Sequence, residues 1–250
     1  MPNDHIGTPR FIQENFSING KQIFVFNTII NSVYSTSIRK AGTENNYYNE
    51  TVEKKLLCDS IEAPFSKFST NFLNSKTLNE KLSLIKENVD IIERFVKFAC
   101  FRSKRGFNMV KEQSITGQVF NFSHSDFLAI ENNCNATILS CIGEKREILP
   151  IFNEYKENFI NNSLGFTLLH MNDINANIIF LPLNSKCGLY IQEKCKHNYE
   201  TILVSNKKQI DFLNTKTCIY EKLYGNGYLF SEKNRPWIRI KIFSLNYHNI

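Results

Sequence analysis

Six polar side chains are spread along the sequence and belong to the residue types that phosphodiester chemistry uses: His5, Arg10, Tyr48, Glu62, Arg102 and Asp173. A histidine and a carboxylate can act as general base and general acid near neutral pH. An arginine can hold a phosphate through two parallel hydrogen bonds. If the fold gathers these groups, they suit cleavage of a phosphodiester or binding of a nucleotide, and we take them as the candidate catalytic set.

Each of these side chains also has a structural interpretation, and the sequence leaves both open. His5 can hydrogen-bond near the terminus, and Arg102 can stabilise the end of a helix through the helix dipole. Arg10 and Glu62 can form an ion pair that holds the N-terminal arm on the first helix. Under the catalytic hypothesis, this pair forms the floor of a pocket that Tyr48 also lines.

The N-terminal arm itself is expected to dock in one rigid pose. Pro9 fixes its own φ angle and pushes Thr8 into an extended conformation. Phe11 and Phe16 then offer apolar anchors. We therefore expect the arm to pack on the first helix and to carry its polar side chains with it.

Possible metal ligands occur in three short groups without a recognised spacing: Cys187 with Cys195 and His197, His124 with Asp126, and His170 with Asp173. The sequence has no P-loop, no Gly-x-Gly-x-x-Gly and no Gly-x-Ser-x-Gly. We predict no metal site, and the sequence identifies no cofactor.

The composition is that of a packed globular protein. Hydrophobic residues make up 42% of the 250 residues, and 21 are phenylalanine. Charged residues interrupt the first twenty positions, and the apolar run at 178–183 is far too short to span a bilayer. The seven scattered cysteines are typical of reduced thiols in a cytoplasmic protein. The net charge of +6 permits contact with a nucleic acid but does not require it.

The first part of the chain predicts a hairpin followed by helices. Residues 21–38 hold two runs of β-branched and aromatic residues with a polar turn between them, which predicts a β-hairpin. Over residues 50–72, apolar positions recur every three to five residues, which predicts a helix that Pro64 kinks or divides. Residues 77–102 begin with a Thr-x-x-Glu capping box and predict one long helix.

The second half is expected to be richer in strands. We predict a short helix at 149–159, strands at 166–170, 178–183 and 189–192, a short helix from about 206, a turn at 225–227, and late strands at 228–230 and 237–243. Helices and strands segregate along the chain, so the predicted class is α+β with an N-terminal β-hairpin, a helical middle and a β-rich C-terminal half. We expect residues 1–250 to form a single domain.

The N-terminal run from His5 to Phe11, with the Asn15-Phe16 pair after it, resembles an uncharacterised bacterial family, domain of unknown function 4238. Segments similar to the rest of that family are found at 44–48, at Glu62, at Arg102 or Arg105, and at 180–184, 211–214 and 228–231. The family usually has one residue fewer between its His and Pro. It often has a Thr-Ser-Asp-Asn-Pro run where this chain has residues 170–174, and Asp173 is the counterpart of that Asp. The resemblance implies a bacterial setting and confers no reaction.

Two functional hypotheses from different classes follow. In the first, the protein is a hydrolase acting on a nucleic acid or nucleotide, such as a nuclease-like effector in bacterial stress or phage defence. Basic residues interleaved with phenylalanines over 97–107 suit a nucleic-acid surface, although a helix with a buried Phe face and a basic end has the same pattern. In the second, the protein is a non-catalytic interaction module whose polar residues hold its structure.

Overall fold

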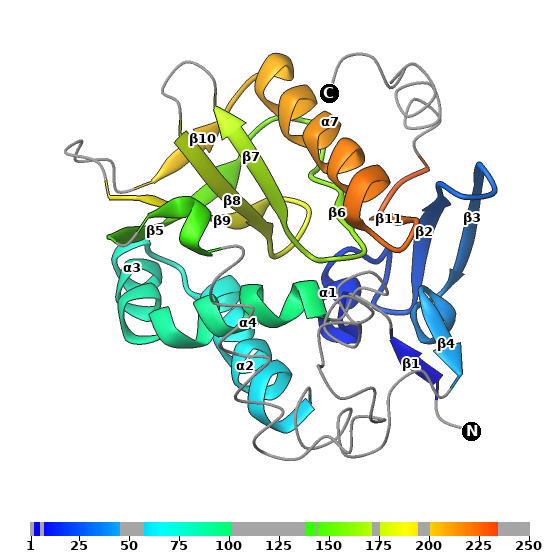
Figure 1. The fold of residues 1–250 in the computed structure, drawn as a ribbon, viewed down its shortest axis with the longest axis horizontal. Coiled ribbons are helices and arrows are strands. Elements are labelled where there is room, and N and C mark those ends of the chain that lie inside the picture. Colours follow the sequence, from blue (N-terminus) through cyan, green and yellow to red (C-terminus); the bar gives the residue numbers. More distant parts are fainter. Residues whose placement is uncertain are drawn as a thin grey trace, which may run out of the picture.

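A computed structural model describes residues 3–5, 8–45, 58–101, 139–143, 145–171, 176–194 and 201–234. These residues form helices together with mixed and antiparallel sheets, so the predicted α+β class is confirmed. In Figure 1 a five-stranded sheet lies between helix α7 (Lys207–Tyr224) above and the helices α2 to α4 below, and a four-stranded sheet lies to the right.

The five-stranded sheet has the order β10-β5-β9-β8-β7. Its strands are β5 (Arg146–Asn153), β7 (Thr167–Met171), β8 (Ala176–Pro182), β9 (Cys187–Glu193) and β10 (Ile202–Val204). All neighbours are antiparallel except β10, which runs parallel to β5. The predicted strands at 166–170, 178–183 and 189–192 are therefore confirmed.

The predicted helix at 149–159 is wrong, because β5 occupies its first half. Four consecutive residues of β5, from Ile148 to Ile151, are buried. A strand covered on both faces shows no alternation of apolar and polar residues, so its apolar run cannot be told from a helix by periodicity. The side chain of Asn153 ends the strand by binding the carbonyl of Glu157 and the N–H of Tyr155.

The four-stranded sheet has the order β3-β2-β11-β6 and is antiparallel throughout. Its strands are β2 (Gln22–Asn27), β3 (Ser32–Ser37), β6 (Asn161–Asn162) and β11 (Tyr228–Ser231). The predicted hairpin at 21–38 is therefore confirmed, and Asn31 adopts a positive φ of 51° in its turn. β11 confirms the late strand at 228–230, whereas 237–243 lies outside the described residues.

A smaller pair of strands joins the two ends of the N-terminal region. β1 (Asn3–His5) pairs antiparallel with β4 (Thr43–Asn45), which follows the short 3₁₀ helix η1 (Ile38–Lys40). Between β1 and β2 lies helix α1 (Arg10–Asn15). Phe16 directly after α1 is fully buried in the main core, as expected for an anchor of the N-terminal arm.

The described residues 58–101 contain the helices α2 (Ala63–Asn74), α3 (Leu78–Glu87) and α4 (Val89–Phe101). Pro64 lies in the first turn of α2, where its missing N–H breaks no helical bond. The capping box of Thr77 and Glu80 is confirmed at the start of α3. The single helix predicted over 77–102 is wrong, because the chain breaks at Asn88, whose side-chain amide donates to the carbonyl of Leu84 over 2.8 Å.

Helix α7 is much longer than the short helix expected from about residue 206. Asn206 caps it by accepting from the N–H of Gln209, as its position predicts. The interior of α7 holds β-branched Thr217 and polar Asn214, both fully buried, and these residues weaken the sequence signal of a helix. Packing against β6, β7 and β11 sustains the helix instead.

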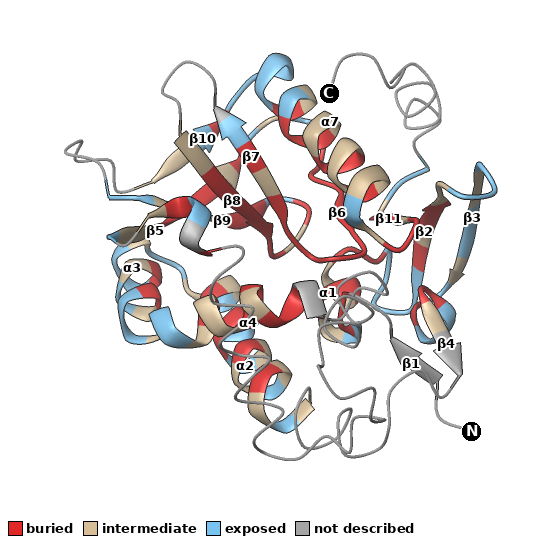
Figure 2. Ribbon diagram, viewed as in Figure 1, coloured by how far each residue is buried: buried red, intermediate tan, exposed pale blue. Residues whose placement is uncertain are grey.

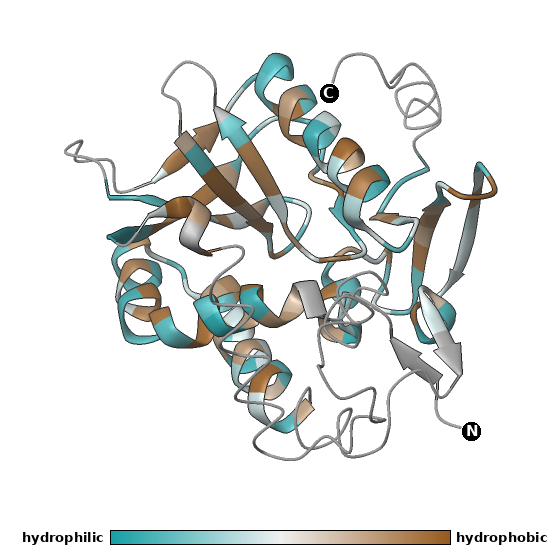
Figure 3. Cartoon of the chain, viewed as in Figure 1, coloured by the Kyte–Doolittle hydropathy of each residue, from teal (hydrophilic) through white to brown (hydrophobic). Residues whose placement is uncertain are grey.

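Most buried apolar residues form one core, which takes residues from Ile12 in α1 to Phe230 in β11. Figure 2 shows this burial along β8, β9 and the inner side of α7, and Figure 3 shows the same strands as the most hydrophobic part of the ribbon. A smaller cluster of Phe26, Ile160, Cys218 and Leu229 lies on the α7 side of the four-stranded sheet. None of the described helices combines the length and apolarity needed to cross a membrane.

A buried polar network as the candidate functional site

Three of the six predicted site residues, His5, Arg10 and Glu62, lie in the described part of the chain. Tyr48, Arg102 and Asp173 lie outside the described residues, and His5 is described as part of strand β1, paired with Thr43. Glu62 lies directly before α2 and is half-buried. Arg10 is at the start of α1 and is exposed. The structure therefore places Arg10 at the start of α1 and Glu62 just before α2, and the candidate catalytic set stays a prediction.

The expected ion pair between Arg10 and Glu62 is wrong. The Nε atom of Arg10 lies 3.0 Å from Oε1 of Glu14, one turn further along the same helix, and both side chains are largely solvated. The expected docking of the arm on the first helix is nevertheless present. Phe11 packs with its ring centroid 6.1 Å from that of Phe65 in α2, so apolar contacts hold the arm in place of an ion pair.

The largest concentration of buried polar side chains lies elsewhere, between residues 158–167, the N-terminal arm and α7. Its members are at most 7% exposed: Thr8, Asn158, Asn161, Asn162, Ser163, Thr167, Asn214, Thr217, Glu221 and Asn226. Buried polar groups are costly unless they are hydrogen-bonded. We call this set the buried polar network and take it as the candidate site.

The carboxylate of Glu221 in α7 is the charged centre of the network. Its Oε2 accepts the N–H of Ser163 over 2.7 Å, and its Oε1 accepts the N–H groups of Gly227 over 2.6 Å and Tyr228 over 2.7 Å. The hydroxyl of Ser163 lies 2.9 Å from both carboxylate oxygens and accepts the N–H of Asn226 over 2.7 Å. Backbone donors of this kind commonly bind anions, and here a side chain of the chain itself fills their site.

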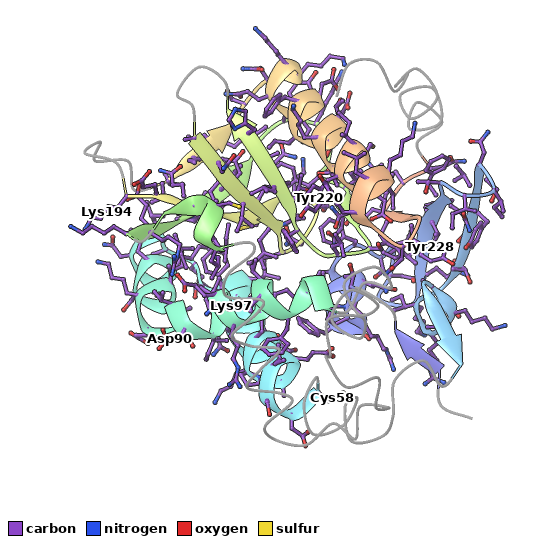
Figure 4. The ribbon with its side chains drawn as sticks, in the orientation of Figure 1. Cys58, Asp90, Lys97, Lys194, Tyr220 and Tyr228 are labelled. Atoms are coloured by element: carbon purple, nitrogen blue, oxygen red, sulfur yellow. The ribbon has the colours of Figure 1, made fainter. Side chains whose placement is uncertain are left out.

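The turn at residues 225–227, predicted from its Gly-Asn-Gly sequence, is shaped around this carboxylate. A Cβ atom at Gly225 would lie 2.2 Å from the carboxylate atoms of Glu221, so a larger residue here would force that carboxylate to move. Gly227 adopts a φ of +93°, which L-residues with side chains rarely adopt. Tyr228 follows the turn at the start of β11, next to β2 (Figure 4).

Burial raises the pKa of Glu221 from its ordinary value of 4.5 to about 7. Loss of hydration disfavours the charged carboxylate and is the larger effect. The hydrogen bonds from Ser163, Tyr228 and Gly227 stabilise the ionised form and oppose the shift. The group therefore changes its charge near neutral pH while it remains enclosed.

The network continues from Ser163 to the N-terminal arm through Asn162. The hydroxyl of Thr8 donates to the carbonyl of Asn162 over 2.6 Å. The side-chain amide of Asn162 donates to Phe166 and to Thr167, whose hydroxyl in turn donates to that of Thr217 over 3.2 Å. These contacts join the arm, the strand β6 and the helix α7 in one hydrogen-bonded unit.

Asn214 in α7 extends the network toward residue 158. Its side-chain carbonyl accepts the N–H of Ile160 over 3.1 Å, and its amide donates to the carbonyl of Asn158 over 3.0 Å. The side chain thus pairs with the backbone as a neighbouring strand would. Further along α7, Tyr220 (labelled in Figure 4) packs against Phe166, with ring centroids 5.6 Å apart.

The chemistry of this arrangement is that of a structural cluster. A serine beside a carboxylate of raised pKa resembles a nucleophile with a base. However, Ser163 and Glu221 are 0% and 1% exposed, and the hydroxyl of Ser163 both donates and accepts within the network. A substrate has no access to either group in this conformation.

Sequence reasoning missed Ser163, Glu221 and their partners. The available signal was weak: a polar Asn-Asn-Ser run at 161–163 inside an apolar stretch, and a glutamate four residues before the Gly-Asn-Gly turn. Neither segment reveals the other, because Ser163 and Glu221 are 58 positions apart.

A buried cation, Lys81, lies between α3 and the five-stranded sheet. Lys81 is 9% exposed, its ammonium donates to the carbonyl of Phe72 near the end of α2, and it lies 4.7 Å from the centroid of the Phe72 ring. Burial lowers the pKa of Lys81 and raises the pKa of nearby Cys187 to about 11. Cys187 is therefore a protonated thiol at neutral pH and a poor nucleophile or metal ligand.

The other proposed metal ligands give no site in the described part of the chain. His170 lies with its Nδ1 3.0 Å from the side-chain oxygen of Asn177. His124, Asp126, Cys195, His197 and Asp173 lie outside the described ranges. Among the described residues, no three of His, Cys, Asp and Glu cluster closely enough to hold a metal ion.

Comparisons with known proteins found no relative of this chain. No protein-family model matches the chain. No curated protein and no solved structure matches it either. The resemblance of its short motifs to domain of unknown function 4238 stays a prediction, and any function has to be inferred from the residues themselves.

Proposed function

We propose that this protein is a non-catalytic interaction module in which the buried polar residues hold the structure. The observation that carries the proposal is the enclosure of Glu221. Its two oxygens accept four hydrogen-bond donors from Ser163, Gly227 and Tyr228, all within the chain. A charged group used in this way joins three segments and has no lone pair directed at a ligand.

The location of the remaining polar candidates supports the same proposal. Arg10 forms an exposed bridge within one helix, which is the geometry of a solvated surface pair. Among the described side chains, Cys58, Cys141, Cys187 and Cys218 form no disulfide bond. Cysteines outside disulfide bonds support our expectation of a cytoplasmic location.

An activity screen with folded variants tests this proposal. The wild-type chain and Glu62→Gln are incubated with a mixed pool of RNA, DNA and nucleotides, with and without Mg²⁺, and the products are quantified. We expect no turnover by either protein. Turnover by the wild type that Glu62→Gln abolishes, with unchanged circular dichroism and melting temperature, would overturn the proposal.

A hydrolase of nucleic acid or nucleotide, acting in bacterial stress or phage defence, is the second candidate. Two observations favour it: the net charge of +6, which attracts phosphates, and the contact of Phe11 with Phe65, which brings the helix of Arg10 beside the helix that follows Glu62. Expression toxicity distinguishes this candidate. We expect a hydrolase to slow the growth of its host, and Glu62→Gln to restore growth at equal protein level.

A further inference from the structure

Strand β3 ends the four-stranded sheet and has one ladder partner, β2, within the described part of the chain. In Figure 1 it lies at the right-hand margin of the ribbon. In an antiparallel strand, alternate residues direct their N–H and C=O groups away from the neighbour, so β3 presents a row of backbone donors and acceptors on its outer side.

The sequence of β3 lacks the features with which proteins usually block such an edge. Ser-Val-Tyr-Ser-Thr-Ser contains no charge, no proline and no glycine, although 22% of the whole chain is charged. Tyr34 is 39% exposed, and Ser35 and Ser37 are exposed as well. Lysine, proline or a bulge would prevent a further strand from pairing, and β3 has none of them in its six paired residues.

The two ends of β3 differ in charge. Lys21, Arg39 and Lys40 lie at its C-terminal end, where the carbonyl of Lys21 accepts the N–H of Ile38 over 3.0 Å. At the other end, the turn between β2 and β3 is uncharged and carries Ile29 and Ile30, which are 73% and 66% exposed. The outer edge of β3 is therefore polar and uncharged along its length, with basic residues at one end and apolar residues at the other.

We propose that β3 pairs antiparallel with β3 of a second copy of this chain, which joins two four-stranded sheets into one. Around a two-fold axis, the basic end of each copy meets the uncharged, apolar turn of the other. A parallel pair would bring the two basic ends together, and that like-charge contact would oppose it. Burial of Ile29 and Ile30 in the contact stabilises the dimer further, in addition to the backbone hydrogen bonds between the two strands. This inference is independent of the buried polar network and goes beyond the proposed function.

The contact is small, so we expect a reversible dimer whose population rises with concentration. Sedimentation velocity of the full chain over a concentration series measures it. Ser35→Lys places a charge in the middle of β3 and two such charges near each other across the axis. We expect this change to raise the dissociation constant about tenfold or more.

The matched control is Thr70→Lys, which adds the same charge at an exposed position of α2, away from the edge. We expect it to leave the dissociation constant unchanged, and circular dichroism checks that both variants fold. Hydrogen exchange supplies a second readout, since alternate amides of β3 should gain protection as the concentration rises. A chain that stays monomeric throughout, or a dimer that Ser35→Lys and Thr70→Lys affect equally, overturns the proposal.

Discussion

Glu221 and Ser163 are joined twice: the carboxylate of Glu221 accepts both the backbone N–H of Ser163, over 2.7 Å, and its hydroxyl, over 2.9 Å. The contact ties α7 to the residue directly after β6, a strand that carries few hydrogen bonds of its own in the sheet. The same hydroxyl receives the N–H of Asn226, so one serine side chain supports both the helix end and the turn after it.

Replacing the serine hydroxyl should therefore be costly. Ser163→Ala removes one donor from a buried carboxylate and leaves the N–H of Asn226 without its acceptor. We expect a loss of about 2–3 kcal/mol in the free energy of unfolding, measured by urea denaturation. Ser83→Ala is the control, because the hydroxyl of Ser83 donates to Glu87 on the exposed side of α3, and its loss should cost less than about 0.5 kcal/mol. Equal losses in the two variants would contradict a structural role for Ser163.

The raised pKa of Glu221 predicts a dependence of stability on pH. A carboxyl group whose pKa rises from 4.5 to about 7 on folding holds its proton more tightly in the folded state. The free energy of unfolding should then fall as the pH rises from about 4.5 to 7, by roughly 3 kcal/mol at most, and level off above 7.

Urea denaturation between pH 5 and pH 8 measures this dependence, with Glu221→Gln as the comparison. The glutamine cannot titrate, so the fall in stability over this interval should be smaller in the variant. Identical pH profiles for the two proteins would show that Glu221 keeps an ordinary pKa in the folded state.

Replacing Gly225 is predicted to lower the stability of the fold because of Glu221. Its φ of −81° suits any residue, so the cost of Gly225→Ala comes from the 2.2 Å approach of the new Cβ to the carboxylate. We expect Gly225→Ala to lower the free energy of unfolding by about 1–3 kcal/mol, measured by thermal or urea denaturation. In a Glu221→Ala background the same change should cost much less, and strictly additive losses would rule out the contact.

The control for Gly225 is Gly20→Ala. Gly20 has a φ of +71°, and a Cβ atom at this position would meet nothing within 4 Å, so the change should cost about 1 kcal/mol from backbone strain alone. The cost at Gly20 should not change in the Glu221→Ala background.

A buried and an exposed ion pair should contribute different amounts to the free energy of unfolding. Arg146 in β5 binds Glu93 in α4 through two hydrogen bonds of 2.8 and 3.1 Å, and both side chains are largely buried. A double-mutant cycle with Arg146→Ala and Glu93→Ala should give a coupling of about 1–3 kcal/mol. The exposed pair of Arg10 and Glu14 should give about 0–0.5 kcal/mol in the same experiment. A larger coupling for the exposed pair would contradict this ranking.

The features that the sequence predicted well depend on neighbours in the chain. The hairpin at 21–38 follows from β-branched and aromatic residues around a turn, and the capping box of Thr77 and Glu80 needs one helical turn. Pro64 indicates the start of α2 because it lacks an N–H and is tolerated only in the first turn of a helix. Such local signals are complete within a few residues.

The features that the sequence did not predict depend on distant partners. β5 is a strand because β9 and β10 flank it, and its apolar run alone fits a helix equally well. The Asn88 break separates α3 from α4 through one side-chain bond. The buried polar network joins residues 8, 158–167 and 214–227, and no pattern within one segment indicates the others.

The position of β11 between β2 and β6 also fixes when the four-stranded sheet can form during synthesis. The hairpin β2–β3 is synthesised before its partner β11, and the inner side of β2 pairs only with residues 228–231, about two hundred positions later. Pairings of such long sequence separation form slowly, and an open strand edge is prone to wrong partners in the meantime. During synthesis, β2 therefore lacks its second partner strand until residues 228–231 have been made.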